Sequence, residues 1–276
     1  MGWARRSGFR EGKRLSSSIS EAGWTVDEET VVVGGLPITV VDRVGAAEAM
    51  CRAAVARRGL GGSPRFVTSA NGQVLALCDR DPEVRDLFLR ADVIHADGMP
   101  MVFASRLFGH RPLPERVATT DLVHDVMAIA PRHGIRSFLL GGRPEVNAAA
   151  IAALRGLYPD GPEIGGHHGY FDDGEEGDVV AAIDRFAPDI LWVGLGVPKE
   201  QRFALRHLER LRHVGVIKTC GGLFDFLAGE RRRAPVFLQR IGMEWAWRAI
   251  LEPRRLGRRY LETNLTALRL LLTQTS

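Results

Sequence analysis

Short apolar runs that end in glycine and lead into helical segments recur along this chain. Strands that alternate with helices predict a sheet of mainly parallel strands, because a parallel connection needs a crossover long enough for a helix. We therefore expect an α/β fold with a Rossmann-like, mainly parallel sheet flanked by helices. The runs and their glycines are 136–140 with Gly141 and Gly142, 189–193 with Gly194 and Gly196, and 214–219 with Gly221 and Gly222.

These strand-end glycines suit nucleotide binding. Glycine lets the backbone approach a ligand closely, and the helix that follows offers N–H groups and a partial positive charge to phosphate. However, none of the three runs completes the G-x-G-x-x-G pattern of dinucleotide-binding proteins. The six glycines are therefore candidates for substrate binding, and the alternative for each is a plain strand-to-helix turn.

The rest of the chain fits the same architecture. The β-branched runs on either side of Gly34-Gly35 predict a hairpin over 30–41, and residues 65–68 predict a further strand. Apolar residues recur at helical spacing in most of the remaining segments. We expect helices over 44–58, 73–78, 82–90, 100–108, 121–133, 144–158 and 198–211.

Asp97 follows a short apolar strand over 92–96 and precedes Gly98. Open α/β sheets bind ligands beyond the carboxyl ends of their strands, so this carboxylate would project into the binding crevice. Asp97 is our candidate for the reacting group. The alternative is a helix cap, because Asp often accepts hydrogen bonds from the first N–H groups of a helix, and one is expected to begin near Met99.

A length of 276 residues suits one large α/β domain with a small appendage, or two modest domains. We expect a disordered leader over 1–28, a core over 29–229 and a helical appendage over 230–276. No run of about 18 apolar residues is present, so no segment is expected to span a bilayer. The three cysteines are far apart, which favours neither disulfides nor a zinc site and suits a reducing cytosol.

Two acidic groups resemble metal ligands at first sight. Asp79 and Asp81 precede Pro82, an arrangement that suits a helix cap. Asp172 and Asp173 begin an acidic, glycine-containing segment that suits a solvated loop. We therefore expect no metal site and no cofactor.

Positive charge is concentrated at the C-terminus. Residues 229–276 contain ten Arg and four Glu, a net charge of +6, whereas the whole chain carries +4. Residues 235–251 predict one helix, and a second, Arg-rich amphipathic helix follows Glu252-Pro253. Such a helix is typical of a membrane-surface element. The alternative is a helical cap packed on the sheet with its arginines in water, and the two are compatible.

Several short motifs, taken in order, resemble those of the WecG/TagA/CpsF family of bacterial glycosyltransferases, family twenty-six. The resemblance extends from about Val31 to the end of the chain and leaves only the leader outside. The motifs lie at 93–98, 114–117, 138–144, 168–171, 193–199, 221–229, 233–235 and 252–255.

This resemblance implies transfer of one sugar, with inversion and without a metal ion, from a UDP-sugar to a polyprenyl-diphosphate-linked sugar in cell-surface polysaccharide synthesis. Asp97 would be the general base for the acceptor hydroxyl. The protein would be cytoplasmic and held at the inner face of the cytoplasmic membrane, with self-association left open. Truncation after Gly229 is expected to abolish activity and membrane association together.

The resemblance also implies substrate contacts. The family's T-x-N motif corresponds to Ser69 and Asn71 unless Thr68 takes the threonine place, and its glutamine after Pro-Lys corresponds to Gln201 or Glu200. Three arginines of the appendage would close over the site and meet the diphosphate. The implied substrate contacts are Thr68, Ser69, Asn71, Arg116, Lys199, Gln201, Arg248, Arg255 and Arg258, together with the six glycines.

Three other classes of function compete. A nicotinamide-dependent oxidoreductase would use the glycine-rich strand ends, but its fingerprint is missing. A non-catalytic nucleotide-binding module at the membrane surface would bind UDP without consuming a donor sugar. Nucleic-acid binding is not expected, because no recognition motif accompanies the basic segment.

Overall fold

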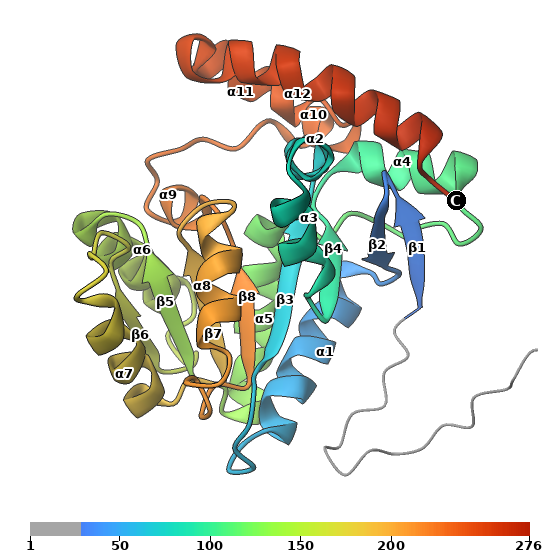
Figure 1. Ribbon diagram of the computed structural model, residues 1–276. Coiled ribbons are helices and arrows are strands. Elements are labelled where there is room, and N and C mark those ends of the chain that lie inside the picture. Colours follow the sequence, from blue (N-terminus) through green and yellow to red (C-terminus); the bar gives the residue numbers. More distant parts are fainter. Residues whose placement is uncertain (1–28) are drawn as a thin grey trace, which may run out of the picture.

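The computed structural model describes residues 29–276, without the side chains of Arg248 and residues 253–261. The predicted leader, 1–28, lies outside the described residues. The predicted α/β class is confirmed, because a six-stranded sheet with order β4-β3-β8-β7-β5-β6 has parallel pairing throughout (Figure 1). Its strands are β3 (Arg65–Ala70), β4 (Val93–Ala96), β5 (Ser137–Gly141), β6 (Ile164–His167), β7 (Ile190–Gly194) and β8 (Val216–Thr219).

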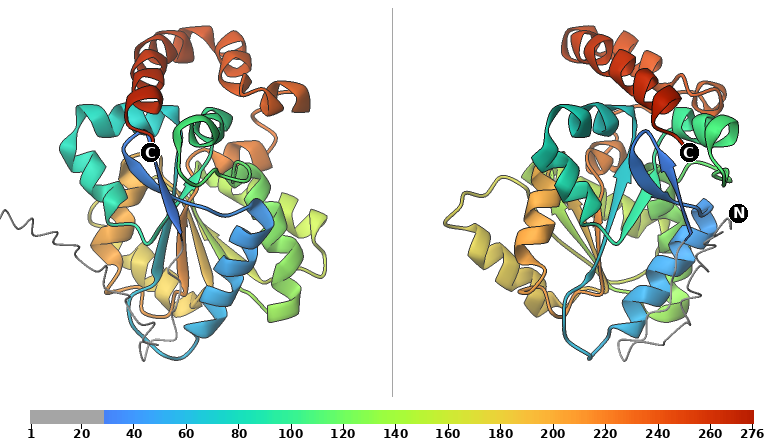
Figure 2. Two further views of the ribbon diagram at one scale, coloured as in Figure 1. Left: turned by 90° about the vertical axis from the view of Figure 1, so that its right-hand side faces the viewer. Right: turned by 45° about the vertical axis from the view of Figure 1, so that its right-hand side comes forward.

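Helices cover both faces of this sheet (Figure 2). Strand residues alternate between the faces, so that Val67 and Val216 pack with α1, α5 and α6, whereas Phe66 and Ile217 pack with α7 and α8. The helices are α1 (Arg43–Ala56), α2 (Gly72–Arg80), α3 (Pro82–Leu89), α4 (Met99–Phe108), α5 (Thr119–His133), α6 (Pro144–Leu157), α7 (Glu176–Phe186), α8 (Lys199–His207), α9 (Leu223–Leu227), α10 (Val236–Arg240), α11 (Glu244–Leu251) and α12 (Pro253–Thr273).

The C-terminal end of the chain is built into the core. Strands β1 (Thr30–Val33) and β2 (Leu36–Thr39) form the predicted hairpin, whose turn glycine Gly35 donates its N–H to the Gln274 carbonyl at 2.8 Å. Leu270 and Leu271 of α12 are buried in the hydrophobic cluster that contains this hairpin, α2 and α4. Truncation after Gly229 would therefore also remove buried core, and single substitutions test the appendage more cleanly.

Two predictions about local structure are wrong. Residues 235–251 do not form one helix, because Gly242 adopts a φ of 78° and separates α10 from α11. The acidic segment after Asp172 is not wholly a solvated loop. Helix α7 begins within it, at Glu176, and the Glu176 carboxylate lies 2.5 Å from His207 Nε2 and accepts from Arg206 at 2.8 Å.

Candidate functional site

Two adjoining cavities lie at the carboxyl ends of the parallel strands. The first has a volume of about 710 Å³ and includes Asp97 in its lining. The second has a volume of about 880 Å³ and extends toward the end of β5. Both are lined by Gly196, Gly221, Gly222, Glu230 and Arg231, so they form one continuous depression where ligands of open α/β sheets bind.

Asp97 lies directly after β4, and its N–H donates to the Ala70 carbonyl at 2.8 Å, which continues the β3–β4 pairing. The alternative that Asp97 caps the next helix is wrong. The N-cap of α4 is Gly98, and no side chain caps that helix. Asp97 also favours the charged forms of Lys218 and Arg233 electrostatically, so two cations lie in its field.

The two candidates for the family's threonine, Ser69 and Thr68, are adjacent in β3 and lie on opposite faces of the strand. Ser69 lines the first cavity, together with Asn71, whose side chain accepts from Val74 N at 3.2 Å as the N-cap of α2. Thr68 is fully buried on the opposite face of the strand, where its hydroxyl lies 2.8 Å from Thr219 Oγ1. Of these two, Ser69 is the residue in reach of a ligand.

Glu200 and Gln201 are likewise neighbours in α8, but their side chains have different surroundings. Gln201 is 0% exposed and donates to Thr68 Oγ1 at 3.2 Å, away from the cavity lining. Glu200 lines the first cavity, where its Oε2 accepts from the N–H groups of Gly196 at 3.1 Å and Gly221 at 3.0 Å. Burial raises the pKa of Glu200 to about 7, although these hydrogen bonds act to lower it. Of the two residues that could take the glutamine place, the one that faces the cavity is therefore Glu200, and not Gln201, which we expected to contact substrate.

Lys218 was missed by sequence reasoning altogether. It is a 0% exposed lysine in β8, and its Nζ donates to Ser69 Oγ at 2.7 Å and to the Thr219 carbonyl at 3.0 Å. Burial lowers the pKa of Lys218 to about 8, partly offset by the field of Asp97. A charged residue inside the otherwise apolar run of β8 was the sequence signal that could have identified it.

Glycine is required where β5, β7 and β8 end side by side. Gly141 adopts a φ of 139°, and a Cβ there would lie 2.3 Å from the Gly194 carbonyl oxygen. A Cβ at Gly194 would lie 2.9 Å from the Gly221 oxygen. Gly142 and Gly194 line the second cavity, whereas Gly141 is buried beneath it and supports their close approach.

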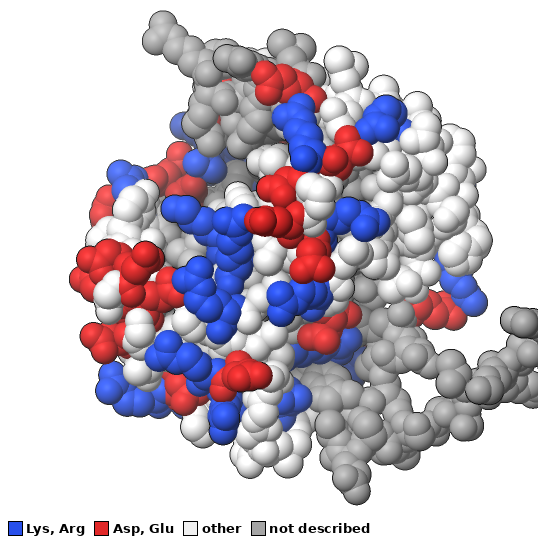
Figure 3. Space-filling view, in the orientation of Figure 1, with Lys and Arg blue, Asp and Glu red and all other residues white. Residues whose placement is uncertain are grey.

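The second cavity is lined by five cations and four carboxylates and has aromatic side chains at its rim. Figure 3 shows Lys and Arg side chains gathered over the region of α8 and α9, with acidic side chains among them. Tyr170 is 70% exposed, which leaves its ring open to a ligand. The cations in the lining are Arg143, Lys199, Arg202, Arg206 and Arg231.

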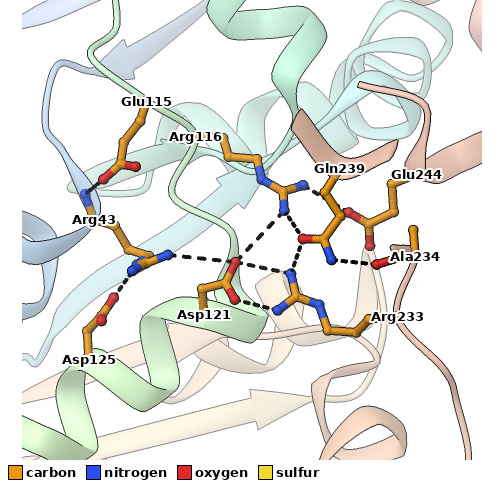
Figure 4. A network of polar contacts seen from close by, with 9 residues as sticks. All are labelled: Arg43, Glu115, Arg116, Asp121, Asp125, Arg233, Ala234, Gln239 and Glu244. Atoms are coloured by element: carbon orange, nitrogen blue, oxygen red, sulfur yellow. Dashed lines mark hydrogen bonds and ion pairs between the residues drawn. The ribbon is translucent and has the colours of Figure 1, made fainter. Parts of the chain in front are cut away.

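Arg116 belongs to a polar network that joins the core to the appendage (Figure 4). Its guanidinium donates to Glu244 of α11 at 2.9 Å and to Gln239 of α10 at 2.6 Å. Asp121 of α5 pairs with Arg233, and although burial opposes its ionisation, Arg233 holds the pKa of Asp121 below its usual range. Among the described residues, Arg116 is in the lining of neither cavity. Its hydrogen bonds instead hold α10 and α11 against the core.

Comparison with known proteins identifies the family of this chain. The model of the Glycosyl transferase WecG/TagA/CpsF family matches residues 31–276. The chain belongs to this family. An N-acetylglucosaminyldiphosphoundecaprenol N-acetyl-beta-D-mannosaminyltransferase of Staphylococcus aureus is 33% identical over 193 residues, which cover 70% of this chain and 74% of the relative. The enzyme of a second strain of that species matches to the same extent.

Family membership makes the protein a glycosyltransferase and favours that function over the oxidoreductase and nucleic-acid alternatives. In this glycosyltransferase the start of the α11–α12 junction lies over the site, since Leu251 and Glu252 line the first cavity. Arg248 belongs to α11, and Arg255 and Arg258 belong to α12. Their side chains are outside the described residues, so their predicted contact with diphosphate stays a prediction.

Three of the four carboxylates considered as metal ligands, Asp79, Asp81 and Asp172, have other partners. Asp81 accepts from Glu83 N at 2.9 Å as the N-cap of α3, and Asp79 pairs with Arg269 at 2.6 Å. Asp172 accepts from the N–H of Gly174. Within the described part of the chain, no three His, Cys, Asp or Glu side chains come together as metal ligands would, and no helix has the length and hydropathy to cross a bilayer.

Proposed function

We propose that this glycosyltransferase moves one sugar, with inversion and without a metal ion, from a UDP-sugar to a sugar carried on polyprenyl diphosphate, for cell-surface polysaccharide synthesis. The observation that carries the proposal is the position of Asp97, in a cavity continuous with a second one rich in glycine and arginine. The first cavity would hold the acceptor, and the second would hold the nucleotide.

The acceptor is inferred from the relatives. Their name specifies an N-acetylglucosaminyl group on diphosphoundecaprenol as the acceptor and an N-acetylmannosaminyl group as the sugar transferred. Hydroxyl and amide groups of Ser69, Asn71 and Thr119 line the first cavity and suit a sugar of this kind. We therefore assign the same class of acceptor, and an N-acetylhexosamine donor, to this chain.

The chemical step follows from Asp97. A sugar hydroxyl is a weak nucleophile, so the Asp97 carboxylate takes its proton as the acceptor oxygen forms a bond to the anomeric carbon of the donor. The bond between that carbon and the β-phosphate oxygen breaks, and its electron pair leaves with UDP. Asp97 then releases the proton to solvent. Proton removal of this kind typically contributes about 10²–10⁴ to the rate.

Charge on the departing UDP needs stabilisation. The strand ends at Gly194 and Gly221 lead into helix N-termini, and Arg143, Lys199 and Arg231 line the same cavity. Fixed dipoles and cations of this sort stabilise charge that develops in a transition state. The exposed ring of Tyr170 would stack on the uracil.

Inversion is part of the proposal because Asp97 serves as a base and not as a nucleophile, so the acceptor oxygen displaces UDP directly, in one step. Glu200, Glu230 and Glu252 also line the first cavity. The Glu200 carboxyl group is 3% exposed and accepts two backbone N–H groups, which does not suit a nucleophile. The anomeric configuration of the product tests the single displacement directly.

We predict that the full-length protein transfers sugar from a UDP-N-acetylhexosamine to a short-chain polyprenyl-diphosphate N-acetylglucosamine at equal rates with and without EDTA. A panel of UDP-sugars, followed by chromatography of the lipid product and NMR of its anomeric centre, measures this. Loss of transfer in EDTA that returns with added Mg²⁺ would contradict the metal-free mechanism. UDP binding without any lipid product would support a non-catalytic module.

A membrane-linked acceptor requires contact with the membrane, and the structure suggests where. Exposed apolar side chains lie on α4 and α10. The two segments touch, since a Cβ at Gly242 would lie 3.3–3.6 Å from residues of α4. We name this surface the α4–α10 patch; it comprises Phe103, Leu107, Phe108, Val236, Phe237 and Ile241. The positive charge of 229–276 would add attraction to anionic lipid.

Replacing Leu107 and Phe237 together by Ser is expected to weaken binding to anionic vesicles about tenfold, because two large side chains lose their apolar burial. Co-sedimentation with vesicles measures it. Leu157→Ser is the matched control, because Leu157 is 61% exposed on α6, away from the α4–α10 patch. Unchanged vesicle binding with a shift from oligomer to monomer would assign the patch to self-association instead.

A further inference from the structure

Lys218 occupies a position where strands of a covered parallel sheet normally carry apolar side chains. Its backbone pairs with Val67 on one side and Trp192 on the other, at the centre of the sheet. Val216 packs against the α1, α5 and α6 core, so Lys218, two residues later, lies on the same face. A buried ammonium at such a place is costly unless it has specific partners.

The hydrogen bonds of Lys218 determine how Ser69 is oriented. A protonated lysine has three donors and no acceptor, so Ser69 Oγ must accept in their 2.7 Å hydrogen bond. The Ser69 proton is then directed elsewhere, either to Thr119 Oγ1 at 3.3 Å or to a ligand in the first cavity, which both hydroxyls line. The ammonium therefore fixes Ser69 as a hydrogen-bond donor toward the cavity.

The charges around Lys218 are those of the site itself. Asp97 at the end of β4 and Glu200 on α8 favour the ammonium form, and Lys218 in turn opposes protonation of the buried His95. Cys220 in the next turn is a neutral thiol, because burial raises its pKa well above the usual value. The attraction between Lys218 and Asp97 is mutual, so the ammonium favours the Asp97 carboxylate, the form that can accept a proton.

We propose that Lys218 is a positioning residue for glycosyl transfer, which fixes the Ser69 hydroxyl as a donor to the acceptor sugar and keeps a positive charge beside Asp97. This inference rests on the proposed function, because it takes the first cavity to hold the acceptor. Lys218 does not touch the reacting atoms. It acts through Ser69 and Asp97.

A pH dependence follows from this arrangement. As the pH rises through the pKa of Lys218, about 8, the amine becomes neutral and can accept from Ser69 instead of donating. Both the donor orientation of Ser69 and the charge beside Asp97 are then lost. Wild-type kcat/KM for the acceptor is therefore expected to fall on the alkaline side near pH 8.

The test compares wild type with Lys218→Met, Ser69→Ala and the double variant in the transfer assay from pH 5 to pH 10. Lys218→Met is expected to lower kcat/KM for the acceptor about 10- to 100-fold, the effect of one charged hydrogen bond. Its alkaline limb should disappear, because methionine does not titrate. The double variant should lose little more than the single ones, because the two residues act through each other.

Thermal unfolding separates positioning from a structural role. Lys218→Met leaves the neighbouring carboxylates without their cation, so its thermal midpoint is expected to fall, and the transfer assays are run below that midpoint, on folded protein. Loss of activity with an unchanged pH profile, or additive losses in the double variant, would overturn the proposal. A wild-type profile without an alkaline limb would also overturn it, even if the variant did not fold. Absence of wild-type transfer would instead refute the proposed function.

Discussion

Asp97→Asn is expected to reduce kcat by about 10²–10⁴, because the amide cannot take the proton of the acceptor hydroxyl. The substitution keeps the size and shape of the side chain. It leaves in place the Asp97 N–H bond to the Ala70 carbonyl, which pairs the end of β4 with β3. Steady-state transfer assays measure the loss, and UDP affinity should stay near that of wild type, because the cavity assigned to the nucleotide does not include Asp97.

Asp92→Asn is the matched control for this substitution. Asp92 precedes the same strand at its opposite end, where its carboxylate accepts from Phe66 N at 2.7 Å, an interaction that Asn can retain through its amide oxygen. Asp92→Asn is expected to transfer sugar at the wild-type rate. An equal loss in both variants would mean that the effect comes from the stability of β4 and not from the chemistry.

Gly141→Ala is expected to destabilise the fold by about 3 kcal/mol or more and to weaken UDP binding strongly. The alanine would have to keep a φ of 139°, and its Cβ would meet the Gly194 carbonyl oxygen at 2.3 Å, which only a backbone shift can relieve. Backbone strain and overpacking each cost on the order of 1–3 kcal/mol. The shift would displace Gly194, which lines the second cavity.

Gly156→Ala provides the control for glycine replacement. Gly156 lies in α6, and a Cβ there would have no heavy atom within 4 Å. Because alanine is the better helix former, this variant should gain about 0.5–1 kcal/mol. Chemical denaturation and calorimetric titration with UDP measure both variants. Wild-type stability and UDP affinity of Gly141→Ala would contradict the claim that the close packing of β5 against β7 requires glycine at position 141.

The sequence predicted the architecture well, because its hydrophobic periods and glycine positions are local signals. The runs before Gly141, Gly194 and Gly221 are β5, β7 and β8, and each precedes a helix. Asp97 was a candidate because open α/β sheets bind ligands beyond the carboxyl ends of their strands, and the structure places it in the lining of the first cavity. Helix α7 was missed because its first residues are acidic and resemble a loop.

Side-chain direction was the part that sequence alone could not give. Ser69 and Thr68 differ only in the face of β3 on which they lie, and one residue of register exchanges them. Glu200 and Gln201 differ by about 100° around α8, so only the helix phase decides which faces the cavity.

Contacts between distant segments were equally out of reach. Arg116 has the residue type of a substrate ligand, yet its partners Gln239 and Glu244 lie more than a hundred positions later. No local pattern predicts such a pairing. Lys218 is different, because a lysine within a buried strand carries a signal of its own, and its partner Ser69 lies on the neighbouring strand.

The central claim is that Asp97 removes the proton of the acceptor hydroxyl. Single-turnover transfer, with enzyme in excess over a radiolabelled UDP-sugar and with saturating lipid acceptor, tests it most directly, because product release then has no effect on the rate. We predict that Asp97→Asn forms lipid-linked product at least 10²-fold more slowly than wild type while binding UDP equally well. Product formation at the wild-type rate would contradict the account.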